Sequence, residues 1–220
     1  MSQIVKTLHE PFSAGYYTLS GNTIDVDTHH VDFAEVIKSI EKAEKEHGVV
    51  FIKELAYCVI RQWEEFKDNI QFFSRCKHMY LVREPKESIT SLVKQMRKVY
   101  GEDCPLERIE KAVGIQDLIS MRKIYDGLTI DSGELTANPE KILKEICDYF
   151  ALTFDERMLT WEQGSLPDWK IWASKGWHDN AIRSTGFTEE MCKDRENHDN
   201  SIEKEYVLRI LQKTASPFLN

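Results

Sequence analysis

Residues 78–91 read HMYLVREPKESITS, which predicts a strand, a turn and a helix in direct succession. The apolar run Met79–Val82 has the length and composition of a buried strand. Pro85 suits the first turn of a helix, where its missing N–H group is not needed. Arg83 stands between the two elements, and the helix carries the hydroxyls of Ser88 and Ser91. A fixed positive charge, two hydroxyls and the backbone N–H groups at a helix start favour the binding of a phosphate.

Other parts of the chain alternate between strand and helix patterns. Val49–Ile52 and Leu128–Ile130 predict two further strands. Asn138, followed by a proline, is expected to cap a helix. Helical spacing of apolar residues is found at residues 89–100, 106–124, 138–150 and 201–212. This alternation predicts an α/β protein, a three-layer sandwich with a mainly parallel sheet, formed by a single domain over residues 1–220.

Composition narrows the classes of function. The 220 residues carry a formal net charge of −8, which argues against nucleic-acid and anionic-membrane partners, because both reward clustered lysine and arginine. No apolar run reaches the roughly 18 residues of a membrane span, and no signal segment opens the sequence, so we expect a cytoplasmic protein. The five cysteines form no C-x-x-C pair, so we expect neither a metal site nor a disulfide framework.

Several further motifs accompany the pattern Arg-x-Pro-x5-Ser that ends at Ser91. They are HEPF at residues 9–12, IDSGELTANPE at 130–140, FDERMLTWEQG at 154–164 and STGF at 184–187. Taken in this order, they resemble a bacterial and fungal branch of the sulfotransferase-like proteins, which share a fold with the P-loop NTPases. The resemblance covers nearly the whole chain. It implies a P-loop sulfotransferase-like fold and the sulfate donor 3′-phosphoadenosine 5′-phosphosulfate (PAPS).

The resemblance also implies roles for residues that would bind this donor. Arg83 and Ser91 would contact the 3′-phosphate, and Ser88 lies one helical turn before Ser91 on the same face. A flexible basic loop that closes over the nucleotide would include Lys175, Arg183 and Ser184. Alternatives without a binding role stay open. Ser88 and Ser91 could be ordinary polar residues on the first turns of a helix, and Lys175 and Arg183 could be solvated charges in a loop.

Transfer of a sulfuryl group needs cations around the transferred group and a base near the acceptor hydroxyl. Lys53, at the end of the strand Val49–Ile52, could supply a cation. In many cytosolic sulfotransferases a histidine base stands two residues after a comparable lysine, but here that position is Leu55. His9 and Glu10 are the substitutes, with a purely structural ion pair of Glu10 as the alternative.

The family's phosphate loop, which holds the 5′-phosphosulfate, is expected to be missing together with the first strand. Relatives with the HEPF motif carry this loop some tens of residues earlier, and here only Met1–Leu8 precede His9. Three explanations compete: a truncated product, a naturally shortened relative, or a site completed by another chain. An open sheet edge would favour the last, as a homodimer.

The resulting function is PAPS-linked transfer of a sulfuryl group to a hydroxyl or amine acceptor, or an inactive descendant of such an enzyme. The alternative is a non-catalytic nucleotide-binding or protein-interaction module derived from the same fold. A nucleoside-phosphate kinase is a weaker third interpretation, because such kinases depend even more on the phosphate loop. The sequence does not identify the small-molecule acceptor, because loops that line such pockets carry no readable code.

Overall fold

The structure is a computed structural model that describes residues 5–13, 15–16, 32–62, 70–165, 169, 176–187 and 208–210. The chain divides into two compact units, each described here by itself. Unit 1 comprises Met1–His78, Asp117–Gly127 and Leu166–Ile171. Unit 2 comprises Met79–Gln116, Leu128–Ser165 and Trp172–Asn220. The single domain expected over residues 1–220 stays a prediction.

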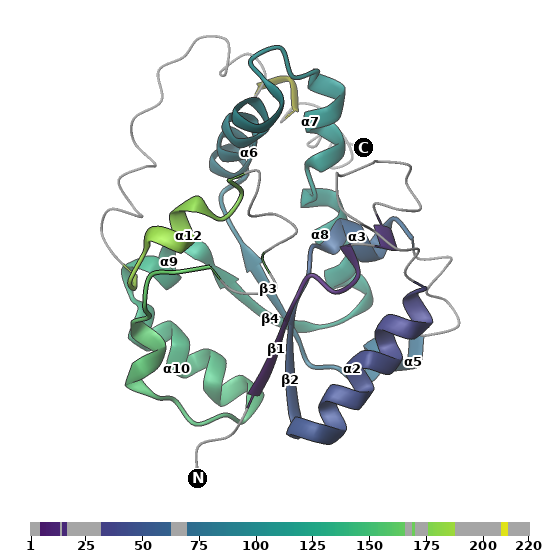
Figure 1. The fold of residues 1–220 in the computed structure, drawn as a ribbon, viewed down its shortest axis with the longest axis vertical. Helices are drawn as coiled ribbons and strands as arrows, with labels where there is room; N and C mark the ends of the chain where they lie inside the picture. Colours follow the sequence, from purple (N-terminus) through teal and green to yellow (C-terminus); the bar gives the residue numbers. More distant parts are fainter. Residues whose placement is uncertain are drawn as a thin grey trace. The chain divides into compact units, whose positions relative to one another are not determined.

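Unit 1 is built on two parallel strands, β1 (Val5–His9) and β2 (Val49–Lys53). The two strands lie side by side (Figure 1), and their register pairs Val5 with Val49 and His9 with Lys53. Parallel strands in this register end at the same edge, so the residues that follow His9 and Lys53 emerge side by side. The carboxyl ends of parallel strands are the usual place for ligands in α/β proteins.

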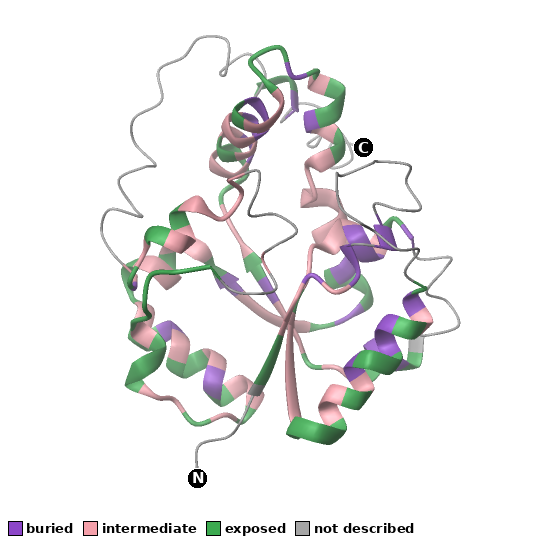
Figure 2. Ribbon diagram, in the orientation of Figure 1, coloured by how far each residue is buried: buried purple, intermediate pink, exposed green. Residues whose placement is uncertain are grey.

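Helix α2 (Phe33–His47) connects these two strands and packs against both. The side chain of Asp32 accepts a hydrogen bond from the N–H of Ala34 at 2.9 Å and so caps the helix start. Gly48 ends it with a positive φ of 78°, a conformation that glycine adopts without cost. The helix is amphipathic, and Figure 2 shows its buried and exposed positions on different sides. The buried side consists of Phe33, Val36, Ile37 and Ile40.

The core of unit 1 is aromatic. Phe12, three residues after the end of β1, is 1% exposed, and its ring centroid lies 6.1 Å from that of Phe33 and 5.7 Å from that of Phe73. Two short helices, α3 (Ala56–Ile60) and α5 (Ile70–Arg75), complete the described part of this region. The turn after β1 is therefore fixed to the core by its phenylalanine.

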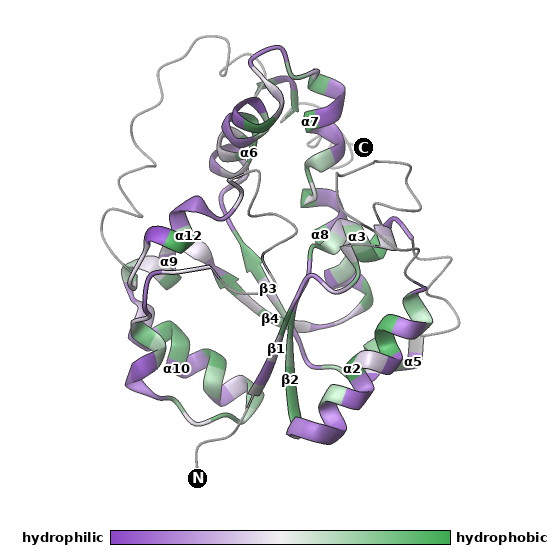
Figure 3. Cartoon of the chain, in the orientation of Figure 1, coloured by the Kyte–Doolittle hydropathy of each residue, from purple (hydrophilic) through white to green (hydrophobic). Residues whose placement is uncertain are grey.

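Unit 2 contains the stretch from which the fold was first inferred. The strands β3 (His78–Val82) and β4 (Gly127–Asp131) are neighbours in a two-stranded sheet. Helix α6 (Pro85–Tyr100) follows β3 with Pro85 in its first turn, and α7 (Leu106–Ala112) packs against α6. Figure 3 shows apolar residues gathered along both strands. The core of this unit comprises Ile89, Val93, Met96, Cys104, Ile109 and Ile210.

Of the remaining helices in the described chain, two are 10 and 12 residues long and the others are shorter. Their bounds are α8 (Ile115–Ile124), α9 (Ser132–Ala137), α10 (Pro139–Phe150), the 3-10 turn η2 (Glu156–Leu159) and α12 (Asp179–Arg183). An isolated antiparallel bridge joins Thr160 to Gly186, and the N–H of Trp161 donates to the carbonyl of Thr185 at 3.0 Å. No helix among the described residues is long and apolar enough to cross a membrane.

The α/β class and the three predicted strands are confirmed, as is the helix that begins at Pro85. Two details differ. Asn138 precedes α10 but its side chain makes no capping hydrogen bond, and its amide N–H donates to the carboxylate of Glu134 at 3.3 Å. The expected helix over residues 201–212 lies outside the described residues except for 208–210, which are helical.

Sequence reasoning expected the first strand and the phosphate loop to be missing. The described residues directly before His9 form β1, a strand that was not predicted, and it pairs with β2. The loss of a strand and a loop still further upstream stays a prediction. So do the cytoplasmic location and the homodimer.

Candidate functional site

Glu10 stands at the first position after β1 and has an unusual backbone. Its φ is +50°, in the left-handed region that non-glycine residues rarely adopt. Its N–H donates to the carbonyl of Lys53 at 2.7 Å, and its own carbonyl accepts from the N–H of Ser13 at 3.1 Å. These bonds hold the turn in place although the conformation costs about 1–3 kcal/mol. Such strain is concentrated at functional positions.

The structure brings the three predicted catalytic residues together in unit 1. The ammonium of Lys53 contacts Oε1 of Glu10, and Nε2 of His9 lies 3.6 Å from the same oxygen. The side chain of Glu10 is only 6% exposed, while that of Lys53 is 44% exposed. The His9 ring also meets Trp169 edge-on, with centroids 6.1 Å apart. The result is a shielded carboxylate with an accessible, flexible cation beside it, an arrangement suited to taking a proton from a substrate.

Glu54 belongs to the same group, and the sequence analysis did not identify it. Its Oε2 accepts from the N–H of Phe12 at 2.8 Å, and its Oε1 accepts from the N–H of Leu55 at 2.8 Å and the hydroxyl of Ser13 at 3.1 Å. Burial of this carboxyl group, opposed by its hydrogen bonds and aided by the nearby charge of Glu10, raises the pKa of Glu54 to about 7. Its position after Lys53 at a strand end was the signal that could have revealed it.

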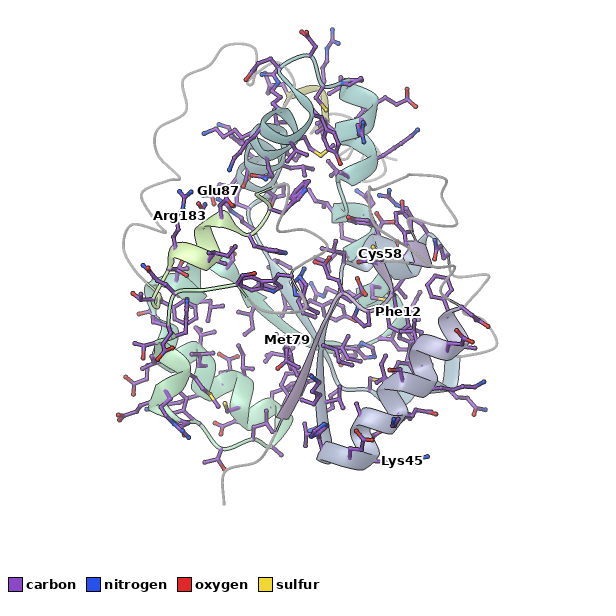
Figure 4. The ribbon with its side chains drawn as sticks, in the orientation of Figure 1. Phe12, Lys45, Cys58, Met79, Glu87 and Arg183 are labelled. Atoms are coloured by element: carbon purple, nitrogen blue, oxygen red, sulfur yellow. The ribbon has the colours of Figure 1, made fainter. Side chains whose placement is uncertain are left out.

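Ser13 and Cys58 are the buried neighbours of Glu10 and Glu54. The Ser13 hydroxyl lies 3.5 Å from Oε2 of Glu10 and 3.5 Å from the sulfur of Cys58. Figure 4 labels Cys58 together with Phe12, which belongs to the turn after β1. Burial, and next the charge of Glu54, raise the pKa of the Cys58 thiol well above its ordinary value. The thiol therefore stays protonated at neutral pH and is not a nucleophile.

In unit 2, Arg83 follows the end of β3 as predicted. Its Nε donates to Oε2 of Glu87 at 3.1 Å, and its side chain is 32% exposed. A guanidinium group has five N–H donors, and the others of Arg83 make no hydrogen bond within the described part of the chain. Ser88 is half-buried on α6 and Ser91 is exposed. Arg83 therefore keeps donors that a phosphate could accept.

The backbone at the start of α6 differs from the expectation of free N–H groups. Pro85 has none, the N–H of Glu87 is capped by the carboxylate of Glu84 at 2.8 Å, and the N–H of Ser88 bonds to the carbonyl of Glu84 at 2.9 Å. The turn also carries two carboxylates. A phosphate bound here would depend on the Arg83 guanidinium and on hydroxyls rather than on the helix start.

The predicted closing loop is only partly described. Ser184 accepts a hydrogen bond from the indole N–H of Trp161 at 3.0 Å and donates to the carbonyl of Ala181 at 2.8 Å, so its hydroxyl has a structural role. Arg183 is exposed at the end of α12. Lys175 lies outside the described residues. Trp161 packs edge-on against Phe187 at 5.3 Å between centroids.

The predicted residues thus form two groups. His9, Glu10 and Lys53 meet in unit 1, where Glu54 and Ser13 join them. The donor-binding candidates around Arg83 belong to unit 2. Each group is described within its own unit.

Comparison with known proteins gives three findings. A sequence model of the sulfotransferase domain matches residues 4–204. The Arabidopsis thaliana branched-chain-amino-acid aminotransferase-like protein 2 is 26% identical over 202 residues, covering 84% of this chain and 32% of that protein. The similar protein 1 from the same plant is 30% identical over 145 residues, covering 62% of this chain and 24% of that protein. The chain therefore spans no more than about a third of the length of these relatives.

Among solved structures, the sulfotransferase domain from the curacin biosynthetic pathway matches this fold with a TM-score of 0.55. The match covers 92% of this chain and 77% of that domain, at 16% sequence identity. This likeness shows the fold alone. The predicted family resemblance is confirmed by the match over residues 4–204.

Proposed function

The chain belongs to the sulfotransferase domain family, and on that premise we propose that it transfers a sulfuryl group from PAPS to a hydroxyl or amine acceptor. The observation that carries the proposal is the contact of Glu10 with Lys53 at the carboxyl ends of β1 and β2. It supplies a base and a cation on adjacent strands, which are the two kinds of group that sulfuryl transfer needs.

The donor requires two anion sites, and the described residues fit one of them. Arg83 has uncommitted N–H donors for the 3′-phosphate, with Ser91 exposed and Ser88 half-buried on the helix that follows. Among the described segments we find no glycine-rich basic turn before a helix for the 5′-phosphosulfate. That cradle would come from outside the described residues or from a second copy of the chain. Bound PAPS would supply the sulfuryl group and a phosphate leaving group.

Glu10 and Lys53 would have different roles in the reaction, Glu10 as the base and Lys53 as the cation. Glu10 accepts the proton of the acceptor hydroxyl, because its carboxylate is fixed by the turn after β1. Lys53 covers Glu10 in the resting protein and has a long, partly exposed side chain. It moves from Glu10 toward the oxygens of the transferred group when the acceptor enters.

A second candidate function is a non-catalytic nucleotide-binding or protein-interaction module. The start of α6 favours it, because Arg83 is already paired with Glu87 and the N–H of Glu87 is already capped. A site whose donors are satisfied internally holds an anion less tightly.

Binding calorimetry with 3′,5′-adenosine bisphosphate tests the donor part of the proposal. We expect wild type to bind and Arg83→Ala to bind at least about tenfold more weakly, because a charge-assisted hydrogen bond contributes about 1.5–3 kcal/mol. Arg157→Ala is the matched control, since Arg157 pairs with Asp155 as Arg83 pairs with Glu87. No binding by wild type would contradict both nucleotide-dependent functions and leave the interaction module.

A further inference from the structure

Two glutamate carboxyl groups lie on either side of one serine hydroxyl inside unit 1. Ser13 Oγ is 3.1 Å from Oε1 of Glu54 and 3.5 Å from Oε2 of Glu10. Ser13 is 3% exposed and Glu10 is 9% exposed, while Glu54 is half-buried, so water has little access to the Ser13–Glu10 side of this bridge. A serine hydroxyl carries one hydrogen but can also accept, so it can connect two acids whichever one holds the proton.

Within the described part of the chain, the hydrogen-bond donors to Glu54 are neutral, although a cation stands close by. It accepts from the N–H groups of Phe12 and Leu55 and from the Ser13 hydroxyl. Lys53 contacts Glu10 instead, and His9 lies beyond it near the same Glu10 oxygen. The other titratable group that faces Glu54 is the Cys58 thiol, whose pKa burial raises, so it stays neutral. Among the described residues, the permanent cation beside the pair Glu10–Glu54 is Lys53, and two like charges in a partly shielded site resist ionising together.

We propose that Glu54 is the positioning residue of Glu10, and that the two carboxyl groups share one proton through the Ser13 hydroxyl. The positioning part follows from two bonds: Glu54 takes the N–H of Phe12 and the hydroxyl of Ser13, and so fixes the turn that carries Glu10 in its left-handed conformation. The role of the shared proton in catalysis rests on the proposed function. The existence of the shared proton follows from the contacts of Glu10, Ser13 and Glu54 and does not depend on that function.

The proton transfer balances as follows. Before the step the shared proton lies on Glu54, which donates to Ser13 Oγ while the Ser13 hydroxyl donates to the Glu10 carboxylate. When Glu10 takes the proton of an acceptor hydroxyl, the acceptor O–H bond breaks, a Glu10 O–H bond forms, and both acids are then neutral. Glu10 returns to the carboxylate form by releasing that proton to water, and no electrons change hands.

NMR titration of isotope-labelled glutamate carboxyl carbons tests the shared proton without nucleotide or acceptor. We expect one carboxyl signal with a midpoint near pH 7, absent in Glu54→Gln. Glu10→Gln should lower that midpoint, because it removes the neighbouring negative charge, and Ser13→Ala should raise it, because it removes a hydrogen bond to the ionised form. Glu46→Gln, on an exposed part of α2, is the matched control and should leave it unchanged.

Several results would overturn the proposal. One is a Glu54 signal with an ordinary glutamate midpoint of about 4.3. Another is a Glu54 midpoint that Glu10→Gln leaves where it was. If Glu54→Gln does not fold, the opposite shifts of one signal in Glu10→Gln and Ser13→Ala identify it. If the Glu54 signal titrates as expected but the protein transfers no sulfuryl group, only the proposed function is contradicted. If the protein is active but the Glu54 signal does not titrate in this way, only the shared proton is contradicted.

Discussion

Lys53 and Glu10 are in contact across the carboxyl ends of two parallel strands, although they lie 43 positions apart in the sequence. The contact follows from the register that pairs His9 with Lys53, because Glu10 is then the first residue past the edge of the sheet. The ammonium is accessible and the carboxylate is shielded. This relationship sets the expected behaviour of both residues.

Lys53→Met should impair transfer far more than it impairs folding. Removing Lys53 leaves the shielded Glu10 carboxylate without its cation and costs about 1–3 kcal/mol of stability, whereas loss of a cation that acts on developing charge lowers kcat by about 100-fold or more. Steady-state kinetics and denaturant unfolding measure the two effects. Lys53→Arg should restore part of kcat, and a loss of activity no larger than the loss of folded protein would contradict a catalytic role.

Ser91→Ala should weaken the binding of 3′,5′-adenosine bisphosphate by about tenfold, since it removes one hydrogen bond to a charged phosphate. Thr90 offers a neighbouring control, because its hydroxyl already donates to the carbonyl of Lys86 at 2.7 Å. Thr90→Val should therefore leave the affinity unchanged. Calorimetry measures the affinity of both variants for 3′,5′-adenosine bisphosphate. Equal affinities for wild type and Ser91→Ala would show that Ser91 does not contact the phosphate.

Glu54 should make the protein less stable as pH rises. Its pKa is raised in the folded state from 4.5 to about 7, so the folded protein binds the proton more tightly than the unfolded chain. The stabilisation from this proton is complete below pH 4.5 and is lost as pH rises through about 7. The loss amounts to about 3 kcal/mol. Urea unfolding at several pH values should show this trend in wild type but not in Glu54→Gln, and parallel pH curves would refute it.

Phe12→Ala should destabilise unit 1 and disturb the turn that carries Glu10. Phe12 is 1% exposed between Phe33 and Phe73, and truncation of such a phenylalanine costs about 3–5 kcal/mol. Leu81→Ala, at a residue that is 53% exposed, should cost much less. Denaturant unfolding compares the two. A small effect of Phe12→Ala would mean that the turn after β1 is not held by the core.

The strand, turn and helix around Arg83 could be predicted because each has a local cause: an apolar run, a proline and helical spacing. Strand β1 was missed, since it is short and its Lys6 and Thr7 are exposed polar residues. Helix α2 carried a readable amphipathic pattern that was overlooked. The place of Glu54 just after a strand end could have marked it as a site residue, but its hydrogen bond with the N–H of Phe12, 42 positions away, could not be predicted from local pattern.

The central claim is that Glu10 is the base of a sulfuryl transfer, and transfer from radiolabelled PAPS to a panel of hydroxyl and amine acceptors tests it most directly. We expect wild type to transfer label and Glu10→Gln to do so at least about 100-fold more slowly. Glu46→Gln, an exposed glutamate on α2, should match wild type. Transfer by Glu10→Gln at the wild-type rate would contradict the role of Glu10, and a wild type that binds 3′,5′-adenosine bisphosphate but transfers nothing would contradict catalysis itself.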